Sequence, residues 1–322
     1  VNIPLVAVCL VLVLTSIPRT DRSAGRRHID IRGAVLAALG LAGPVFALIE
    51  QPDLGWGDPL VAGSLIAGVV LFVTFVMHER RAPDPMLPLD LFKRRNFAAG
   101  NVETLLMYGG LSMLFFLLPI FLQEVAGWSA LDAGLATLPV TVVMFALSRR
   151  FGRLADRYGP RLFMGVGPLV AGAGFALMLR LGHDVNYVTD LLPAVALFAL
   201  GLSMTVAPLT AAVLAGVDGG QAGIASAVNN AIARVAGLLG TALLGTALGG
   251  KMTESGFHTG VAVGATSLIL GGLLGALLVR NPTRVVRAEE CPGGALVGAS
   301  KDAAGCPDLQ GLADREPAVA AS

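Results

Sequence analysis

Nine long apolar segments constrain the fold of this chain more than any other feature of its sequence. A helix needs about 20 mostly apolar residues to cross the hydrocarbon core of a bilayer. Only 14% of the 322 residues are charged, whereas soluble domains carry about 25%. We therefore predict an all-α integral membrane protein with spans at roughly 1–18, 33–50, 59–77, 98–122, 129–148, 162–180, 191–214, 222–248 and 259–279.

The basic residues of the connections between these segments alternate from one side to the other. Five Lys or Arg residues fall in each of 18–32, 78–96 and 149–161, and three more, Arg280, Arg284 and Arg287, lie at the exit from the last span. The opposite connections hold only Lys251, with Arg180 at a span edge. Because short basic loops are retained in the cytoplasm, this alternation predicts nine spans, with the basic connections and the C-terminal tail on the cytoplasmic side of the plasma or inner membrane.

The connection 149–161 carries a residue pattern as well as charge. Gly159 can take backbone angles closed to other residues, and Pro160 suits the first turn of a helix. Asp156 is placed near the positive N-terminal end of the following helix, where neighbouring arginines can pair with it. The residues that form the pattern are Gly152, Leu154, Ala155, Asp156, Arg157, Gly159 and Arg161.

This pattern resembles the cytoplasmic loop signature of the major facilitator superfamily, with Pro160 in place of the usual basic residue. The resemblance implies a latch that holds two helical bundles closed on the cytoplasmic side, formed by Gly152, Asp156, Arg157, Gly159 and Arg161. The alternative is a positive-inside turn with no further role.

Further motifs follow in an order that is similar to the fourteen-helix drug/proton antiporters of that superfamily. They are Asn2-x-Pro4, Leu122-Gln123-x-x-x-Gly127, Ala133-Gly134-x-x-x-Leu138-Pro139, Gly223-Ile224-Ala225-Ser226 and Asn229-Asn230-x-x-x-Arg234. The resemblance implies that the chain is an N-terminally truncated fragment, partnered by the missing helices of the first bundle. On this mapping 1–18 is the last helix of the N-terminal bundle, 33–77 holds two inserted helices and 98–279 is a complete C-terminal six-helix bundle.

The residues after the last span change in composition. Residues 281–322 are rich in Ala, Gly, Pro and charged side chains and poor in large apolar ones. Such a composition cannot bury enough apolar surface to fold, so we expect a disordered cytoplasmic tail.

Two charged residues, Glu103 and Arg234, fall well inside predicted spans, whereas others such as Glu50 lie at span ends. A charge within the membrane is costly and normally faces a polar cavity or a partner. We hypothesise that both border a water-accessible central cavity and that Glu103 takes up a proton. Alternatively, Glu103 reaches water at the cytoplasmic end or pairs statically with a neighbour. The polar residues near them in the sequence, which complete the candidate cavity, are Asn101, Tyr108, Asn229 and Asn230.

Glycines four residues apart recur in the last two spans. Such spacing lets helix backbones approach closely in lipid. It favours packing within one molecule over dimerisation. The pairs are Gly245-x-x-x-Gly249, Gly260-x-x-x-Gly264 and Gly271-x-x-x-Gly275.

The family resemblance implies a transporter that exports hydrophobic or amphipathic compounds in exchange for protons, by alternating access. Its partners would be the lipid bilayer and a lipophilic small molecule, with the proton as coupling ion and no cofactor. Two alternatives stay open: another small-molecule cargo, or a fragment that does not transport.

Nucleic-acid binding has no support because the basic residues are spread among membrane-flanking connections. An enzyme or metal site is disfavoured because no catalytic or metal-ligand spacing joins His28, His78, His183 and His258.

Overall fold

The computed structural model describes residues 2–16, 30–82, 85–215, 217, 221–248 and 252–281. Within these residues the backbone forms helices, turns and bends but no β-strand. The α-helices are α1 (Asn2–Ser16), α2 (Ile31–Leu54), α3 (Pro59–Glu79), α4 (Arg95–Glu124), α5 (Ala130–Leu135), α6 (Leu138–Tyr158), α7 (Pro160–Leu177), α8 (Leu192–Leu214), α9 (Ala222–Leu248) and α10 (Glu254–Leu278). Short 3-10 turns η1 (Leu89–Lys93) and η2 (Met178–Arg180) and a π-helical turn η3 (Tyr187–Leu191) complete the described elements.

The predicted class of an all-α protein with many membrane spans is confirmed. Eight helical segments are long and apolar enough to cross a membrane, with α5 and α6 together making one of them. The described part of α1 is apolar but has only 15 residues. Large apolar side chains also cover the outside of the molecule, and Phe145 on α6 is 91% exposed. Such a surface suits lipid rather than water.

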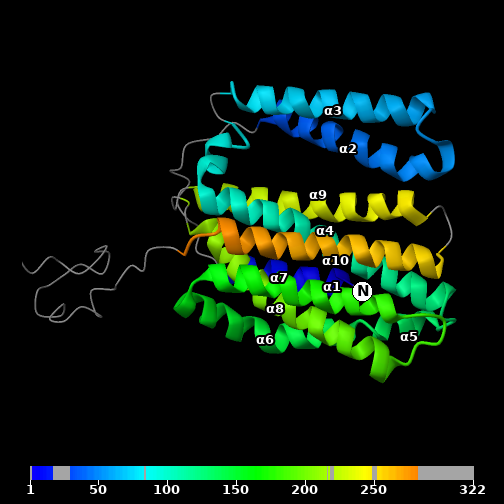
Figure 1. Cartoon of the computed structure of the whole chain (residues 1–322). Helices are drawn as coiled ribbons and strands as arrows, with labels where there is room; N and C mark the ends of the chain where they lie inside the picture. Colours follow the sequence, from blue (N-terminus) through cyan, green and yellow to red (C-terminus); the bar gives the residue numbers. More distant parts are fainter. Residues whose placement is uncertain are drawn as a thin grey trace, which may run out of the picture.

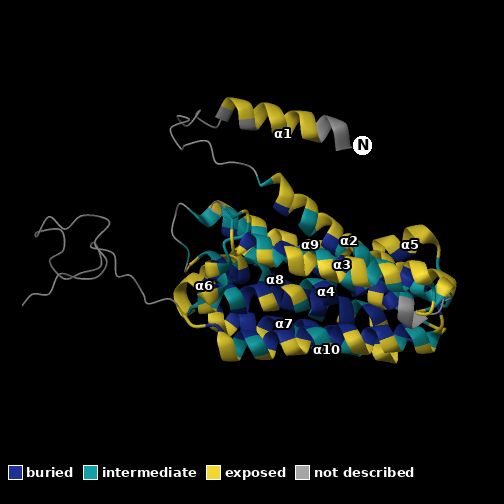
Figure 2. Cartoon of the chain, turned by 90° about the horizontal axis from the view of Figure 1, so that it is seen from above, coloured by how far each residue is buried: buried dark blue, intermediate teal, exposed yellow. Residues whose placement is uncertain are grey.

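The helices of the bundle lie side by side and run in alternating directions (Figure 1). Contacts link them in the order α6, α8, α7, α10, α4 and α9. Helices α2 and α3 pack together as a pair, and α2 contacts α9. In the view from above α1 lies apart from the other helices, and its described side chains are exposed (Figure 2). Buried residues concentrate on α4, α7, α8 and α10, so the core lies among these four helices.

Glycines allow the core helices to approach closely, as their spacing predicts. A Cβ on Gly201 of α8 would collide with the backbone of Ala171 on α7, and one on Gly272 of α10 would lie 2.7 Å from the carbonyl oxygen of Gly165. Gly260 and Gly264 face Leu117 and Phe175 of the same molecule. Gly245 has open space around it, and Gly249 lies outside the described residues.

The structure corrects the expected connection 149–161, which is helical for most of its length. Helix α6 continues to Tyr158, and only Gly159, with φ of 87°, separates it from Pro160 at the start of α7. The reason is local: Arg, Leu and Ala are strong helix formers, and charged side chains let a helix extend beyond the apolar layer. The expected roles of Gly159 as the turn and Pro160 as a helix start are confirmed.

The predicted span 129–148 is also interrupted. It begins as α5, breaks at Ala136 and Thr137, and resumes as α6. Pro139 lies in the first turn of α6, where its missing N–H prevents it from donating to the carbonyl of Leu135. The segment therefore crosses as two helical pieces in tandem.

Candidate functional site

Nearly all described basic residues at the helix ends gather at one end of the bundle, on the left in Figure 1. We call it the basic end. Arg180 lies at the opposite end, and Arg234 lies near the middle of α9. Lys251 lies outside the described residues. The basic end carries Arg32, Arg80, Arg81, Lys93, Arg94, Arg95, Arg149, Arg150, Arg153, Arg157, Arg161 and Arg280.

Two of the five expected latch residues contact the C-terminal end of α10. The side chain of Arg161 donates from Nε to the carbonyl oxygen of Ala276 at 2.7 Å. Its backbone N–H donates to Oδ1 of Asn281 at 3.1 Å. The Asn281 side chain also lies against Gly159, where a Cβ would collide with it. The turn between α6 and α7 is therefore fixed to the end of α10.

The start of α4 binds the same helix end. Arg95 donates from Nε to the carbonyl of Leu278 at 2.6 Å and from a second guanidinium nitrogen to that of Leu277 at 3.1 Å. Asn96 exchanges two hydrogen bonds with the backbone of Arg280. The last carbonyls of a helix lack partners within it and carry partial negative charge. Two arginines from two other helices supply those partners here.

The other three expected latch residues lie on α6. Asp156 and Arg157 are exposed, and no ion pair joins Asp156 to an arginine within the described chain. Gly152 is half-buried, and a Cβ on it would make ordinary contact, at 3.6 Å, with Ala207 of α8. Asp156 and Arg157 are therefore available on the surface for contacts beyond this bundle.

The mid-span polar residues divide into two groups, and the first joins α4 to α9. Nδ2 of Asn229 lies 2.7 Å from Oγ1 of Thr104 and 3.1 Å from Oδ1 of Asn101. Asn101 and Thr104 are buried, and each also donates to the backbone one turn earlier. Asn101 and Asn229 are thus brought together, and Asn229 donates to Thr104 as well.

The second group lies on the outer side of the same two helices. Arg234 and Asn230 are exposed on α9, while Tyr108 on α4 is half-buried and interacts electrostatically with Arg234. Glu103 is fully buried and faces α10. The structure therefore does not place Glu103 beside Arg234: the carboxyl group points into the bundle, and the guanidinium group points out of it.

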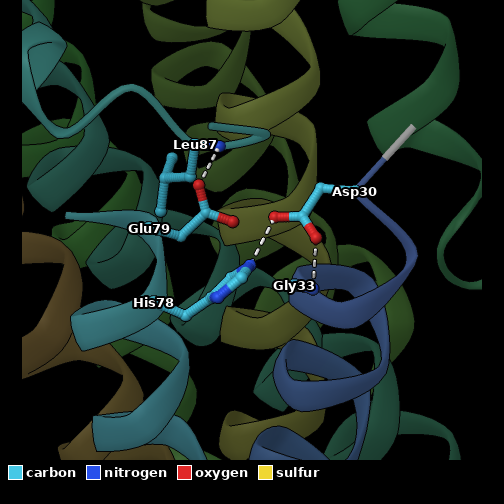
Figure 3. Close-up of polar contacts among 5 residues, drawn as sticks. All are labelled: Asp30, Gly33, His78, Glu79 and Leu87. Carbon is cyan, nitrogen blue, oxygen red and sulfur yellow. Dashed lines mark hydrogen bonds and ion pairs between the residues drawn. The ribbon is translucent and has the colours of Figure 1, made fainter. Parts of the chain in front are cut away.

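A further polar cluster, at the basic ends of α2 and α3, was not anticipated from the sequence (Figure 3). Oδ2 of Asp30 lies 2.8 Å from Nε2 of His78, and Oδ1 accepts from the backbone N–H of Gly33. The Gly33 hydrogen bond, reinforced by His78, lowers the pKa of Asp30 below its ordinary value. Glu79 is 3% exposed, and its Oε2 accepts from the N–H of Leu87. Figure 3 shows its other oxygen, which has no partner among the described residues, pointing toward Asp30.

The sequence signal for this cluster was the N-cap pattern. Asp30 immediately precedes an apolar helical run, the position where a carboxylate caps the first backbone N–H groups. Its pairing with His78, 48 residues later, required the hairpin of α2 and α3. Among the described residues no group of His, Cys, Asp or Glu has the arrangement of a metal site.

These observations define a class: a multi-pass α-helical membrane protein with an apolar core, a few buried polar residues and one strongly basic end. The family follows from comparison with known proteins. The Major Facilitator Superfamily model matches residues 1–241, so this chain belongs to that superfamily, whose members are transporters rather than enzymes.

Several relatives carry names that refer to antibiotics. The puromycin resistance protein pur8 of Streptomyces alboniger is 36% identical over 249 residues, which are 76% of this chain and 49% of that protein. The tetracenomycin C resistance and export protein of Streptomyces glaucescens is 31% identical, over 79% of this chain and 47% of the relative. The cephamycin export protein CmcT of Amycolatopsis lactamdurans is 30% identical, over 92% and 62%. The chain spans about half the length of the relatives that it matches.

Proposed function

We propose that this chain provides the second helical bundle of an exporter of hydrophobic or amphipathic compounds, driven by protons through alternating access. The names of the relatives support export of antibiotics, because three of those most similar are resistance or export proteins. Their length supports the need for further helices, since the matched part is only 47–62% of each relative. We place the protein in the cell membrane with the basic end in the cytoplasm, because basic connections are retained on that side.

One observation carries the transport proposal: the exposure of Arg234 in the middle of a membrane-spanning helix. A guanidinium group facing lipid at this depth would be costly. Its face of the bundle, which includes Asn230 and Tyr108, must therefore meet water or another protein surface. In a transporter with two bundles, a water-filled cavity between the bundles meets this need, and binding sites of such proteins lie near the membrane midplane.

The exposed residues of the basic end fit the same arrangement. Asp156 and Arg157 lie on the surface of α6, while Arg161 and Gly159 are held by α10. In this proposal Arg161 and Gly159 hold the turn in shape, and Asp156 and Arg157 contact the other bundle when the cytoplasmic side closes. The proton is the only coupling species that the proposal requires, and no cofactor takes part.

The test is efflux of a lipophilic dye from bacterial cells that lack their own major efflux pumps. The chain is expressed alone and together with the N-terminal half of pur8, and dye release is followed before and after a protonophore is added. We expect release only with both halves and only with a proton gradient, reduced in Arg234→Ala and largely retained in Arg234→Lys. If both halves reach the membrane and dye release stays at the level of empty cells, a different cargo or a non-transporting fragment is favoured.

A further inference from the structure

The most unusual buried group of the described chain is the carboxyl group of Glu103. The residue lies two turns into α4 with 0% of its surface exposed, and both carboxyl oxygens lack a hydrogen-bond partner among the described residues. An unpaired carboxylate at such a place would be very costly, and a buried acid avoids that cost by becoming neutral. A neutral carboxyl group has one O–H, and inside the protein this O–H needs a hydrogen-bond acceptor.

A backbone carbonyl of α7 lies beside this carboxyl group. A Cβ built on Gly275 of α10 would be 2.6 Å from Oε2 of Glu103 and 2.6 Å from the carbonyl oxygen of Met164. Both oxygens therefore lie around one point that only glycine leaves open. Gly271, one turn earlier, also faces the Glu103 side chain. Three helices thus meet at this point, and the absence of a side chain on α10 leaves room there for both oxygens.

The carbonyl group of Met164 lacks its ordinary donor. In an α-helix the carbonyl of residue 164 accepts from the N–H of residue 168, and residue 168 of α7 is a proline. Proline has no N–H and removes that hydrogen bond. Met164 itself is fully buried. A buried acceptor without its helical donor therefore lies next to a buried acid without an acceptor.

No cation of the neighbouring helices neutralises Glu103. Arg95 on α4 and Arg161 on α7 use their guanidinium groups on the last carbonyls of α10. Between His258 and Arg280, α10 carries no ionisable side chain. Arg234 on α9 lies on the exposed face with Tyr108. Ionised Glu103 would therefore have no counter-charge where α4, α7 and α10 meet.

We propose that Glu103 and the backbone carbonyl of Met164 form a proton-binding site between α4, α7 and α10, opened by Gly275 and created by Pro168. The proton binds to a carboxyl oxygen of Glu103, and the resulting O–H donates to the Met164 carbonyl oxygen after a small side-chain rotation. Loss of the proton to water leaves a carboxylate that repels this carbonyl, so the three helices must loosen or admit water before it can form. Protonation of Glu103 thus favours close packing of the three helices, and deprotonation favours their separation.

This inference rests on the proposed function only for the use of the proton. The site binds a proton whether or not the chain exports a drug. If it serves transport, the coupling proton is held among the core helices α4, α7 and α10, away from the exposed face that carries Arg234, and acts by changing how those helices pack.

Infrared difference spectroscopy of the purified full chain tests the site directly, because a protonated carboxyl group has its own C=O stretch. At neutral pH we expect this band in the wild type and its loss in Glu103→Gln. Pro168→Ala restores an N–H that competes for the Met164 carbonyl, so the Glu103 band should move to higher frequency. The matched control Pro208→Ala, in α8, should leave the band in place.

A second measurement is thermal stability. The unfolding temperature of Glu103→Gln should equal that of the wild type because the Gln amide can still donate a hydrogen bond, and that of Glu103→Leu should be lower.

The following results would contradict the proposed proton-binding site. If Glu103→Gln removes no band at neutral pH, Glu103 is ionised and the site is wrong. If the band is present but Pro168→Ala and Pro208→Ala affect it equally, the Met164 carbonyl is not its acceptor and the pairing is overturned. Should Pro168→Ala fail to assemble, equal stability of Glu103→Leu and Glu103→Gln would overturn the pairing instead. Dye efflux is measured separately: the expected spectra without any efflux would retain the proton site and remove the proposed export.

Discussion

The guanidinium group of Arg161 binds the carbonyl oxygen of Ala276 at 2.7 Å, joining the start of α7 to the end of α10 across 115 residues of sequence. Arg161 is one of the five residues expected to form the cytoplasmic latch, and here it binds a helix end within its own bundle. We expect Arg161→Ala to lower the free energy of unfolding by about 1 kcal/mol, because one hydrogen bond from a charged donor is lost at a partly hydrated site.

The measurement for Arg161 is thermal or denaturant unfolding in detergent. Arg153→Ala is the matched control, since Arg153 lies in the same stretch 149–161 but is exposed on α6. It should leave stability unchanged. Equal losses in both variants would show that the contact with Ala276 contributes nothing of its own.

Asn229 holds α9 to α4 through Thr104 and Asn101. Asn229→Ala leaves the side-chain oxygen of buried Asn101 without this donor, and hydrogen bonds between membrane helices contribute about 0.6 kcal/mol on average. We expect a loss of about that size, and up to about 1.7 kcal/mol, in unfolding by a denaturing detergent. Asn230→Ala, one residue away and exposed, should cause a smaller loss. A larger effect at Asn230 would contradict the assignment.

The cluster of Asp30, Gly33 and His78 predicts a dependence of stability on pH. The pKa of Asp30 in the folded chain lies below its ordinary 3.8, so its ionised form stabilises the start of α2. This contribution is fully present above the ordinary pKa and disappears as the pH falls through the lower, folded-state value. Thermal midpoints measured from about pH 5 down to about pH 3 should therefore fall more steeply in the wild type than in Asp30→Asn. Equal slopes in the wild type and Asp30→Asn would contradict this role of ionised Asp30.

The seam between α7 and α8 predicts a strong effect of one methyl group. A Cβ on Gly201 would collide with the backbone of Ala171, where no flexible side chain can move aside. Overpacking of this kind costs about 1–3 kcal/mol, and we expect Gly201→Ala to lower the thermal midpoint clearly. Gly245→Ala on α9 meets nothing within 4 Å and should be neutral or slightly stabilising, because alanine favours helices. Identical midpoints would disprove the close packing.

The orientation of the basic end is testable by labelling of single cysteines in cells. Cys9, Cys291 and Cys306 are first replaced by serine, and Arg153→Cys or Asp132→Cys is then introduced. Both positions are exposed, at opposite ends of the bundle. We expect a reagent that cannot cross membranes to label position 132 in intact cells and position 153 only after permeabilisation. Labelling of position 153 in intact cells would reverse the proposed topology.

Eight of the nine predicted spans correspond to helical segments long and apolar enough to cross a membrane, and they could be predicted from the sequence because lipid imposes a simple rule. Each span must be long and apolar, and basic connections must alternate, so local composition was sufficient. The ends were harder to predict. The helix α6 runs ten residues beyond the expected boundary, to Tyr158, because apolar character stops at the bilayer surface while helical hydrogen bonding does not.

The site was only partly predictable. The sequence identified Glu103 and Arg234 as the charges within spans, because intramembrane charge is rare and therefore conspicuous. It could not tell that they point in opposite directions, since that depends on which helices flank α4 and α9. Nor could it pair Asp30 with His78 or bring Pro168, Gly275 and Glu103 to one point, because these residues come from different helices.

The sequence by itself determined that this chain is a membrane-embedded helical protein of the major facilitator kind with one basic end, because the length, apolarity and flanking charge of a span are local properties. Only the tertiary structure decided which polar groups meet. Gly275 matters because it faces Glu103 and Met164, and Arg161 because it reaches Ala276. The physical reason is that the direction of a side chain within the membrane is set by helix packing, and packing depends on the shapes of residues far apart in the chain.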